Sequence, residues 1–177
     1  MSDLEWASGF SHAEDSFGFY VNGSYGYSYA HLTIGQSERA PLDELVRILG
    51  EGKVYGPYKN STPGSLIHLY QLGKSLVAEA IYCLLIEQPL TWDKIVGFWE
   101  GDGSIEVNER GYVHITFGQK DRRVLDEIRN FLGKGNICKE SRGHHKLQIY
   151  DGKRELTRRL FESVRSPRRR EQLSKFL

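Results

Sequence analysis

The chain has 177 residues, of which 39% are hydrophobic and 27% charged, a composition typical of a folded protein rather than a disordered one. The longest apolar run, residues 80–86, is too short to cross a bilayer. The two cysteines, Cys83 and Cys138, are isolated, which excludes a zinc site built on paired cysteines. We expect both to be reduced core thiols in an intracellular protein without a secretory signal.

The net charge of +1 is unevenly distributed along the chain. Residues 139–175 carry 12 Lys/Arg and 5 Asp/Glu, a net charge of +7, whereas residues 1–138 sum to −6. A basic C-terminal part suits contact with phosphates, and a solvated face of charged helices accounts for it equally well. The charge therefore permits a nucleic-acid partner without requiring one.

An internal duplication organises the sequence. Residues 34–36 (IGQ) match 117–119 (FGQ), 42–45 (LDEL) match 125–128 (LDEI), and 49–54 (LGEGKV) match 132–137 (LGKGNI), all at an offset of 83. Upstream, residues 9–10 (GF) match 97–98 at an offset of 88. These matches predict two copies of one unit, an N-terminal copy at 1–90 and a C-terminal copy at 91–177.

The elements of each copy follow from hydrophobic periodicity. In the first copy we predict a helix around Gly9 and a long hairpin at 17–32 that is rich in Tyr, Ser and Gly. The rest of the first copy is predicted to have the same order of elements as the second copy. In the second copy, 92–102 is helical, 104–119 alternates as a hairpin, 121–132 is an amphipathic helix that Gly133 ends, 136–150 is a second hairpin, and 153–164 is helical. A short helix at 167–176 follows.

The predicted fold class is therefore α+β. Each copy has the order αββαββα and supplies one four-stranded antiparallel sheet, so the chain consists of two pseudo-symmetric repeats. The two repeats are expected to pack through their first helices, because each of these helices carries a pair of small residues four positions apart. Gly9 and Ala13 form the first pair and Gly97 and Gly101 the second, and such spacing lets two helix backbones approach closely.

A carboxylate follows each pair of small residues, Glu14 in the first copy and Asp102 in the second. If the two helices pack in parallel, both carboxylates emerge at the partly negative C-terminal helix ends. Two acids in that field favour a bound cation, and oxygen ligands favour Mg²⁺. The pattern predicts two or three divalent ions shared between Glu14 and Asp102, with Mn²⁺ able to substitute, and hydrolysis of two phosphodiester bonds.

The residues 97–104 (GFWEGDGS), with the hairpin that ends in 117–123 (FGQKDRR), resemble the LAGLIDADG homing endonuclease family. The two-copy layout resembles the single-chain members of that family over nearly the whole sequence. The resemblance implies that Glu14 and Asp102 bind the catalytic metal, with help from the carbonyls of Ala13 and Gly101. It also implies that Gln36 and Gln119 position solvent.

Further roles follow from the same resemblance. A basic residue is expected near the cleaved phosphates, with Lys120, Arg122 and the cluster at 168–170 as candidates. The first motif departs from relatives, because His12 and Asp15 replace an acid and a glycine. The unequal residues after Gln36 and Gln119 lead to the hypothesis that one DNA strand is cut first.

DNA recognition is expected from the two sheets, because a two-stranded ribbon fits the major groove and alternate side chains then reach the base edges. About half of the candidate readers are expected to face the helices instead. The candidates are Tyr20, Asn22, Ser24, Tyr27, Tyr29, Glu106, Asn108, Arg110, His114, Arg122, Lys139, Arg142, His145, Lys146, Gln148 and Arg169.

Two alternatives stand beside the endonuclease. One is a catalytically silent DNA-binding regulator, and the other is a maturase that helps an intron RNA to fold on the same framework. Loss of one acid would favour either, and both acids are present here. A calcium loop around Asp102 lacks the glycine that an EF-hand needs at its sixth position. We expect a monomer that binds double-stranded DNA and needs neither a protein partner nor a membrane.

Overall fold

The computed structural model describes all residues except 1, 14–16, 23–26, 61–63, 74–75 and 141–142, and it describes 17–22 and 27–31 by their backbone alone. The elements, in chain order, are α1 (Asp3–His12), β1 (Phe17–Asn22), β2 (Tyr27–Gln36), α2 (Ala40–Leu49), β3 (Lys53–Lys59), β4 (Leu66–Leu72), α3 (Leu76–Ile86), α4 (Trp92–Asp102), β5 (Gly103–Val107), β6 (Val113–Gln119), α5 (Arg122–Leu132), β7 (Asn136–Lys139), β8 (His145–Tyr150), α6 (Glu155–Ser163) and α7 (Pro167–Ser174).

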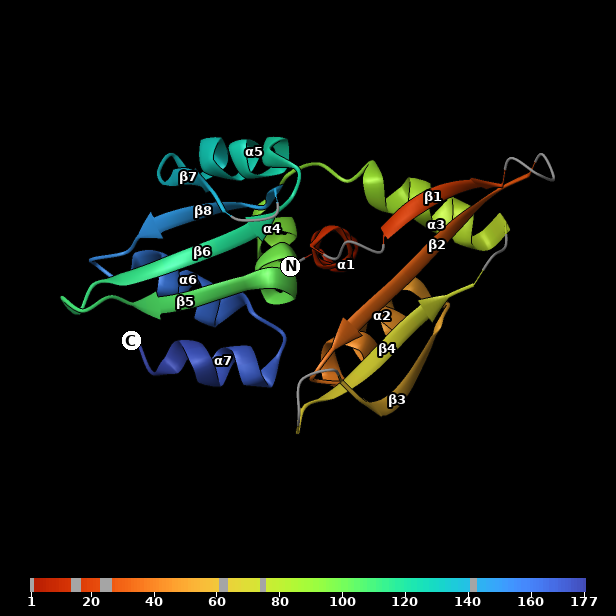
Figure 1. The fold of residues 1–177 in the computed structure, drawn as a ribbon, viewed down its shortest axis with the longest axis horizontal. Helices are drawn as coiled ribbons and strands as arrows, with labels where there is room; N and C mark the ends of the chain where they lie inside the picture. The colour runs from red at the N-terminus through yellow and green to blue at the C-terminus, as the bar shows by residue number, and fades with distance from the viewer. Residues whose placement is uncertain (1, 14–16, 23–26, 61–63, 74–75, 141–142) are drawn as a thin grey trace.

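Two antiparallel sheets of four strands lie on either side of the central helices α1 and α4 (Figure 1). Their strand orders are β1-β2-β4-β3 and β5-β6-β8-β7, so the second sheet repeats the first. In the second sheet, β5 pairs with β6 through Ile105 and Ile115, and β6 pairs with β8 through Ile115 and Ile149. The predicted fold class is confirmed, and the boundary at residue 90 stays a prediction.

Local sequence sets the helix ends. Thr91 caps α4 by accepting a hydrogen bond from the Lys94 amide at 3.3 Å, and Asp121 caps α5 in the same way. α2 and α5 end at Gly50 and Gly133, whose φ angles of 69° and 68° are the left-handed values that favour glycine. The predicted helix stop at Gly133 is therefore confirmed, and Gly50, its counterpart in the repeat, ends α2 in the same way.

Helices α1 and α4 are in direct backbone contact. An ideal Cβ on Gly9 would lie 1.8 Å from the Lys94 carbonyl oxygen, and one on Gly97 would lie 2.0 Å from that of Trp6. A Cβ on Gly101 would meet the Cβ of Ala13 at 2.5 Å. Residues later in α1 contact residues later in α4, so the helices run in parallel and their C-terminal ends meet.

One hydrophobic core extends through both repeats. Trp6 and Phe10 of α1 stack with their ring centroids 5.0 Å apart, and Trp99 of α4 is fully buried. Cys83 and Cys138 are both exposed, so the expectation that they are core thiols is wrong; each lies on the outward side of its helix or strand. Over the part of the chain that the structure describes, no helix is long and apolar enough to cross a membrane.

Candidate active site and nucleic-acid interface

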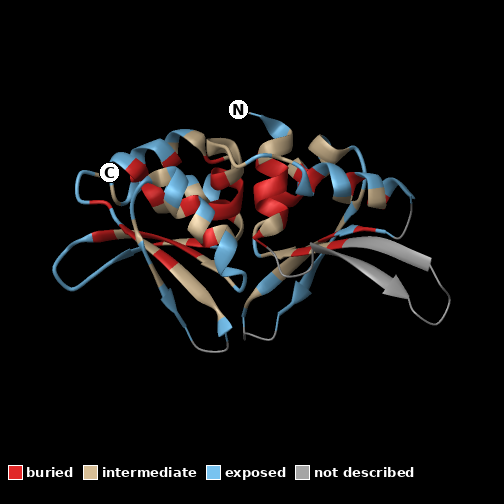
Figure 2. Cartoon of the chain, turned by 90° about the horizontal axis from the view of Figure 1, so that it is seen from above, coloured by how far each residue is buried: buried red, intermediate tan, exposed pale blue. Residues whose placement is uncertain are grey.

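The C-terminal ends of α1 and α4 come together between the two sheets. Figure 2 shows the helices on one side of the described strands. Ala13 and Gly101, the predicted carbonyl ligands, are in contact at this point. The pairing predicted from the small residues therefore brings the two motif ends together. Glu14 follows Ala13 directly but lies outside the described residues.

Asp102 is the last residue of α4 and is exposed at the end where the helices meet. Its carboxylate lies over β6, because a Cβ added to Gly118 would be 3.0 Å from the Asp102 Oδ2. Gly118 therefore leaves room for the carboxylate, and an alanine there would crowd it. The sequence repeat places Gly35 at the matching position in the first sheet.

The two predicted glutamines reach across the boundary between the repeats. The Gln119 Nε2 donates to the His12 carbonyl at 2.9 Å, and its Oε1 accepts from the Lys120 amide at 2.7 Å. The Gln36 Nε2 donates to the Gly101 carbonyl at 3.5 Å. Each glutamine thus contacts the motif helix of the other repeat. A role in positioning solvent stays a prediction.

The other candidates near this end are basic. Lys120 is exposed directly after β6, and its carbonyl accepts a hydrogen bond from the His145 Nδ1 at 3.1 Å. Arg122 begins α5 and pairs with Asp126 at 3.2 Å. His12, which replaces the usual acid, contacts the Ser8 carbonyl through Nδ1 at 2.8 Å, and burial lowers the pKa of its imidazole.

The Arg169 side chain is partly buried against the end of α4. Its Nη2 donates to the Glu100 carbonyl at 3.0 Å and lies 3.4 Å from the Gly101 carbonyl, while its guanidinium carbon is 5.1 Å from the Trp99 ring centroid. The side chain predicted to contact DNA is therefore directed at the end of α4. Burial lowers the pKa of Arg169, and neighbouring Arg168 adds to that effect.

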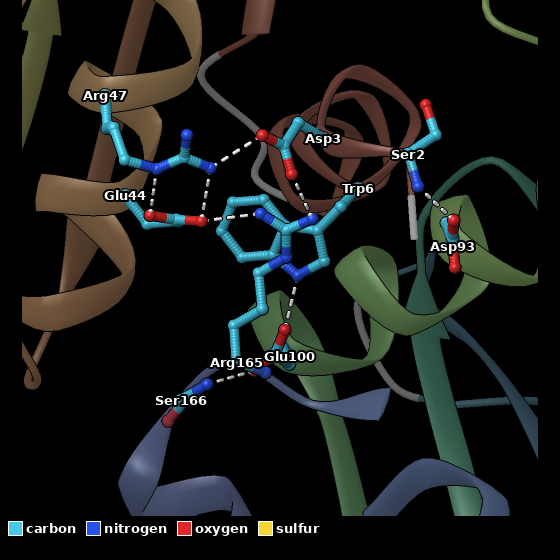
Figure 3. A network of polar contacts seen from close by, with 9 residues as sticks. All are labelled: Ser2, Asp3, Trp6, Glu44, Arg47, Asp93, Glu100, Arg165 and Ser166. Carbon is cyan, nitrogen blue, oxygen red and sulfur yellow. Dashed lines mark hydrogen bonds and ion pairs between the residues drawn. The ribbon is translucent and has the colours of Figure 1, made fainter. Parts of the chain in front are cut away.

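Glu100 and Arg165 have structural roles that sequence reasoning missed. The Glu100 carboxylate is 2% exposed and accepts hydrogen bonds from Trp6 Nε1 and from the Arg165 and Ser166 amides (Figure 3). Burial raises the pKa of this carboxyl, and the three donors oppose the rise. The available signal was an acid at the position where the first repeat has His12.

Four of the predicted DNA readers share the face of the second sheet that is turned away from the helices. Along β6 and β8, the residues on this face alternate with buried residues such as Ile115 and Leu147, which lie on the opposite face. The Lys146 Nζ pairs with the Glu106 Oε1 at 3.1 Å, so these two charges partly compensate each other. The four residues are Glu106, His114, Lys146 and Gln148.

The remaining readers of the second repeat lie elsewhere. Asn108 and Arg110 form the exposed turn between β5 and β6, where the Asn108 Oδ1 accepts from the Arg110 amide at 3.0 Å. Lys139 and His145 pair with each other at one end of the sheet, in register with the strand positions that face the helices. Arg142 falls outside the described residues.

The first repeat gives less information on its predicted readers. Tyr20, Asn22, Tyr27 and Tyr29 lie in the paired strands β1 and β2, which are described by their backbone alone, and Ser24 lies outside the described residues.

Exposed aromatic side chains on β3, at the end of β8 and directly before β6 were missed. Tyr55 and Tyr58 on β3 are 42% and 47% exposed, and β3 also carries Lys53 and Lys59 at its ends. Tyr112 and Tyr150 form an edge-to-face pair with centroids 5.3 Å apart. The signal available in the sequence was that residues 53–59 (KVYGPYK) combine two lysines with two tyrosines.

The donors at the helix ends fit a hard divalent cation. Asp102 and the Gly101 carbonyl supply oxygen atoms at a helix C-terminus, which is partly negative. Among the residues that the structure describes, no three His, Cys, Asp or Glu side chains cluster closely enough to hold a metal. A site here would use one carboxylate from each helix end, together with backbone and solvent oxygens, which is a donor set that suits Mg²⁺.

Comparison with known sequences identifies one part of the chain. Residues 94–169 match the sequence model of the LAGLIDADG-like domain family. This range includes the α4 motif, the second sheet and Arg169. A search of curated proteins finds no match.

Solved structures match the fold over almost the whole chain. The LAGLIDADG meganuclease I-AabMI, bound to uncleaved DNA, has a TM-score of 0.73 and 14% identity over 99% of this chain and 89% of its own. The homing endonuclease I-GzeII, in complex with its DNA target, has a TM-score of 0.64 and 13% identity over 97% and 88%. I-LtrWI, bound to target DNA, gives 0.64 and 12% over 98% and 89%. Residues 94–169 thus match a LAGLIDADG-like domain in sequence, and the chain as a whole has the fold of LAGLIDADG meganucleases.

Proposed function

We propose that this chain is a single-chain LAGLIDADG homing endonuclease that makes a metal-dependent double-strand cut in a long pseudo-palindromic DNA site. The observation that carries the proposal is the parallel contact of α1 and α4, which presents Asp102 between two sheets. The DNA-bound state of the structural neighbours supports DNA as the partner. We expect the protein to act as a monomer, because both halves of the site are in one chain.

Some residues at the ends of α1 and α4 would hold the metal ion, and others fix the positions of the helix ends. Asp102, Glu14 and the carbonyls of Gly101 and Ala13 would hold Mg²⁺, with Mn²⁺ as a substitute. When bound, the ion supplies Lewis acidity at the cleaved phosphate. Gln119 fixes the last turn of α1 through the His12 carbonyl. Lys120 would add positive charge at the phosphates.

Sequence recognition would use the faces of the sheets that are turned away from the helices. His114 and Gln148 offer hydrogen-bonding groups on neighbouring strands of the second sheet, and Lys53 and Tyr55 occupy β3 of the first. A concave pair of sheets can follow the major groove on both sides of the cut. Lys146, paired with Glu106 in the free protein, would exchange that partner for a base or a phosphate.

Cleavage of a randomised DNA library tests the proposal directly. The library would be incubated with Mg²⁺ or Ca²⁺ and the wild-type chain, Glu14→Gln, Asp102→Asn or Asp43→Asn. Asp43 is an exposed acid on α2 that forms an ion pair with Arg39, away from the motif helices, so it controls for loss of one charge. We expect double-strand cuts at one long sequence with Mg²⁺, lost by at least 10²-fold in both motif variants and kept in Asp43→Asn.

Three other outcomes would contradict the proposal or a part of it. Selection of one DNA sequence without cutting in any metal would make this chain a DNA-binding regulator, and Asp102 an ordinary helix-end carboxylate. Selective binding of structured RNA instead would favour the maturase. Cutting that survives Asp102→Asn would remove that carboxylate from the proposed site.

A further inference from the structure

The end of α4 is capped by a cation from the last helix of the chain. The Arg169 guanidinium donates to the Glu100 carbonyl through Nε at 3.2 Å and through Nη2 at 3.0 Å, and Nη2 lies 3.4 Å from the Gly101 carbonyl. Its Nη1 donates to the Gln172 Oε1 at 3.2 Å, which fixes the guanidinium from the other side. Arg169 therefore holds two carbonyls in the last turn before Asp102.

Among the described residues of the first repeat, no element corresponds to α7. Residues 87–91 connect α3 directly to α4, whereas α6 is followed by residues 164–166 and then α7. The offset of 88 makes His12 the counterpart of Glu100. The His12 carbonyl is bound by the neutral amide of Gln119 at 2.9 Å, and the Glu100 carbonyl by a guanidinium. The matching carbonyls near the ends of the two motif helices thus accept hydrogen bonds from chemically different groups.

The two repeats also differ in the carbonyl that each glutamine contacts. By the repeat symmetry, Gln36 should bind the Glu100 carbonyl as Gln119 binds the His12 carbonyl. The Gln36 Nε2 lies instead 3.5 Å from the next carbonyl, that of Gly101, and the Arg169 guanidinium donates to the Glu100 carbonyl.

The charge of Arg169 acts on Asp102 at short range. The carbonyls that it binds belong to the two residues directly before Asp102, and its guanidinium rests against the buried Trp99 ring. Low exposure reduces the screening of this charge by solvent. A cation here offsets the negative end of α4 and repels a divalent ion at the Asp102 carboxylate.

We propose that Arg169 is a positioning residue that fixes the carbonyls of Glu100 and Gly101 and weakens divalent-ion binding at Asp102. The inference deepens the proposed function, because it takes Asp102 as an ion ligand. It gives the α4 half of the site its own ion affinity, set by α7, which has no counterpart among the described residues of the first repeat.

Terbium luminescence tests the inference on the full chain without DNA. Tb³⁺ replaces Mg²⁺, and tryptophan excitation reports Tb³⁺ bound near Trp99. Arg169→Gln and Arg169→Met remove the charge, and the methionine keeps contact with Trp99. Arg169→Lys keeps the charge but loses the forked donor. Arg170→Gln is the matched control, because Arg170 lies on the same helix and donates to the Val164 carbonyl rather than to α4.

We expect both neutral variants to bind Tb³⁺ about three- to tenfold more tightly than wild type, from unit-charge repulsion at short range. Arg169→Lys and Arg170→Gln should stay within about twofold of wild type, and circular dichroism would show that each variant is folded. Asp102→Asn should abolish the tryptophan-sensitised emission.

Three results would overturn the inference. An unchanged affinity in both neutral variants, with emission still lost in Asp102→Asn, would leave the proposed function intact and remove Arg169 from it. Equal changes of Tb³⁺ affinity in Arg169→Lys and Arg169→Gln would mean that the forked geometry of the guanidinium affects ion binding and its charge does not. Emission that survives Asp102→Asn would place the ion elsewhere and count against the metal site itself.

Discussion

Glu100 is a buried carboxylate whose hydrogen-bond donors come from two distant parts of the chain. Trp6 belongs to α1, whereas the Arg165 and Ser166 amides precede α7. One oxygen, Oε1, accepts both amides, at 2.8 Å and 2.6 Å, and Oε2 accepts the indole. A single side chain therefore joins α1, α4 and the C-terminal segment, defined as residues 164–170.

Replacing Glu100 by Gln should destabilise the protein by about 2–3 kcal/mol, because one buried NH₂ group would then face a donor. The measurement is urea unfolding at neutral pH. Glu162→Gln is the control, since Glu162 is exposed on α6, and it should change stability by less than about 0.5 kcal/mol. A loss for Glu100→Gln no larger than that of the control would show that the carboxylate is not needed there.

At the scale of elements, the α1–α4 pair depends on two glycines that face backbone rather than side chains. A Cβ on Gly97 would lie 2.0 Å from the Trp6 carbonyl oxygen and 2.9 Å from the Phe10 nitrogen, so neither side-chain rotation nor local repacking can relieve the clash. The helices would have to separate, and the site at their ends would separate with them.

Gly97→Ala should therefore cost at least about 3 kcal/mol or prevent folding. Gly73→Ala is the matched control, because an added Cβ there meets nothing within 4 Å and the backbone is not left-handed. Thermal unfolding of the two variants checks the prediction. A Gly97→Ala protein with the stability of Gly73→Ala would contradict the close packing of the two helices.

The sequence predicted most of this arrangement because the repeat and the small-residue spacing within each motif are patterns that can be read directly from the sequence. The order of elements, the stops at Gly50 and Gly133, and the contact of Ala13 with Gly101 all follow from patterns within about ten residues. The partners of Glu100 and Arg169 could not be predicted in this way. Their contacts pair groups of the second repeat with each other or with α1, and neither the repeat nor the hydrophobic periodicity indicates which polar groups meet there.

At the scale of the whole molecule, the C-terminal segment ties the second repeat to the first. Arg165 pairs with the Glu44 carboxylate at 2.5 Å and with that of Asp3 at 2.7 Å, and its guanidinium carbon lies 4.8 Å from the Trp6 ring centroid (Figure 3). Ser166 donates to Glu38 at 2.5 Å. Hydrogen bonds from Arg47 and then Arg165 hold the pKa of Asp3 and of Glu44 below their usual values.

Arg165→Gln should lower stability at pH 7 by about 1–2 kcal/mol, a figure reduced for the partial exposure of both acids. Depressed carboxyl pKa values contribute stability above pH of about 4 that is lost as the pH falls through the folded-state values. The difference in the free energy of unfolding between wild type and variant should therefore decrease as the pH falls from 5 to 2–3. Unfolding curves across that range test this, and a gap that widens on acidification would contradict it.

The C-terminal segment also makes the two halves of the chain non-interchangeable. In a chimaera of two second halves, the repeat offsets would replace Ser37, which accepts from Arg168, by Lys120, and Asp3 by Thr91. An arginine would then face a lysine, and Arg165 would lose one of its carboxylates. Such a pairing of like halves is disfavoured by repulsion rather than by shape. When half-domains are exchanged by engineering, residues 164–177 should therefore be transferred together with the residues that they contact in the first repeat, which are Asp3, Ser37, Glu38 and Glu44.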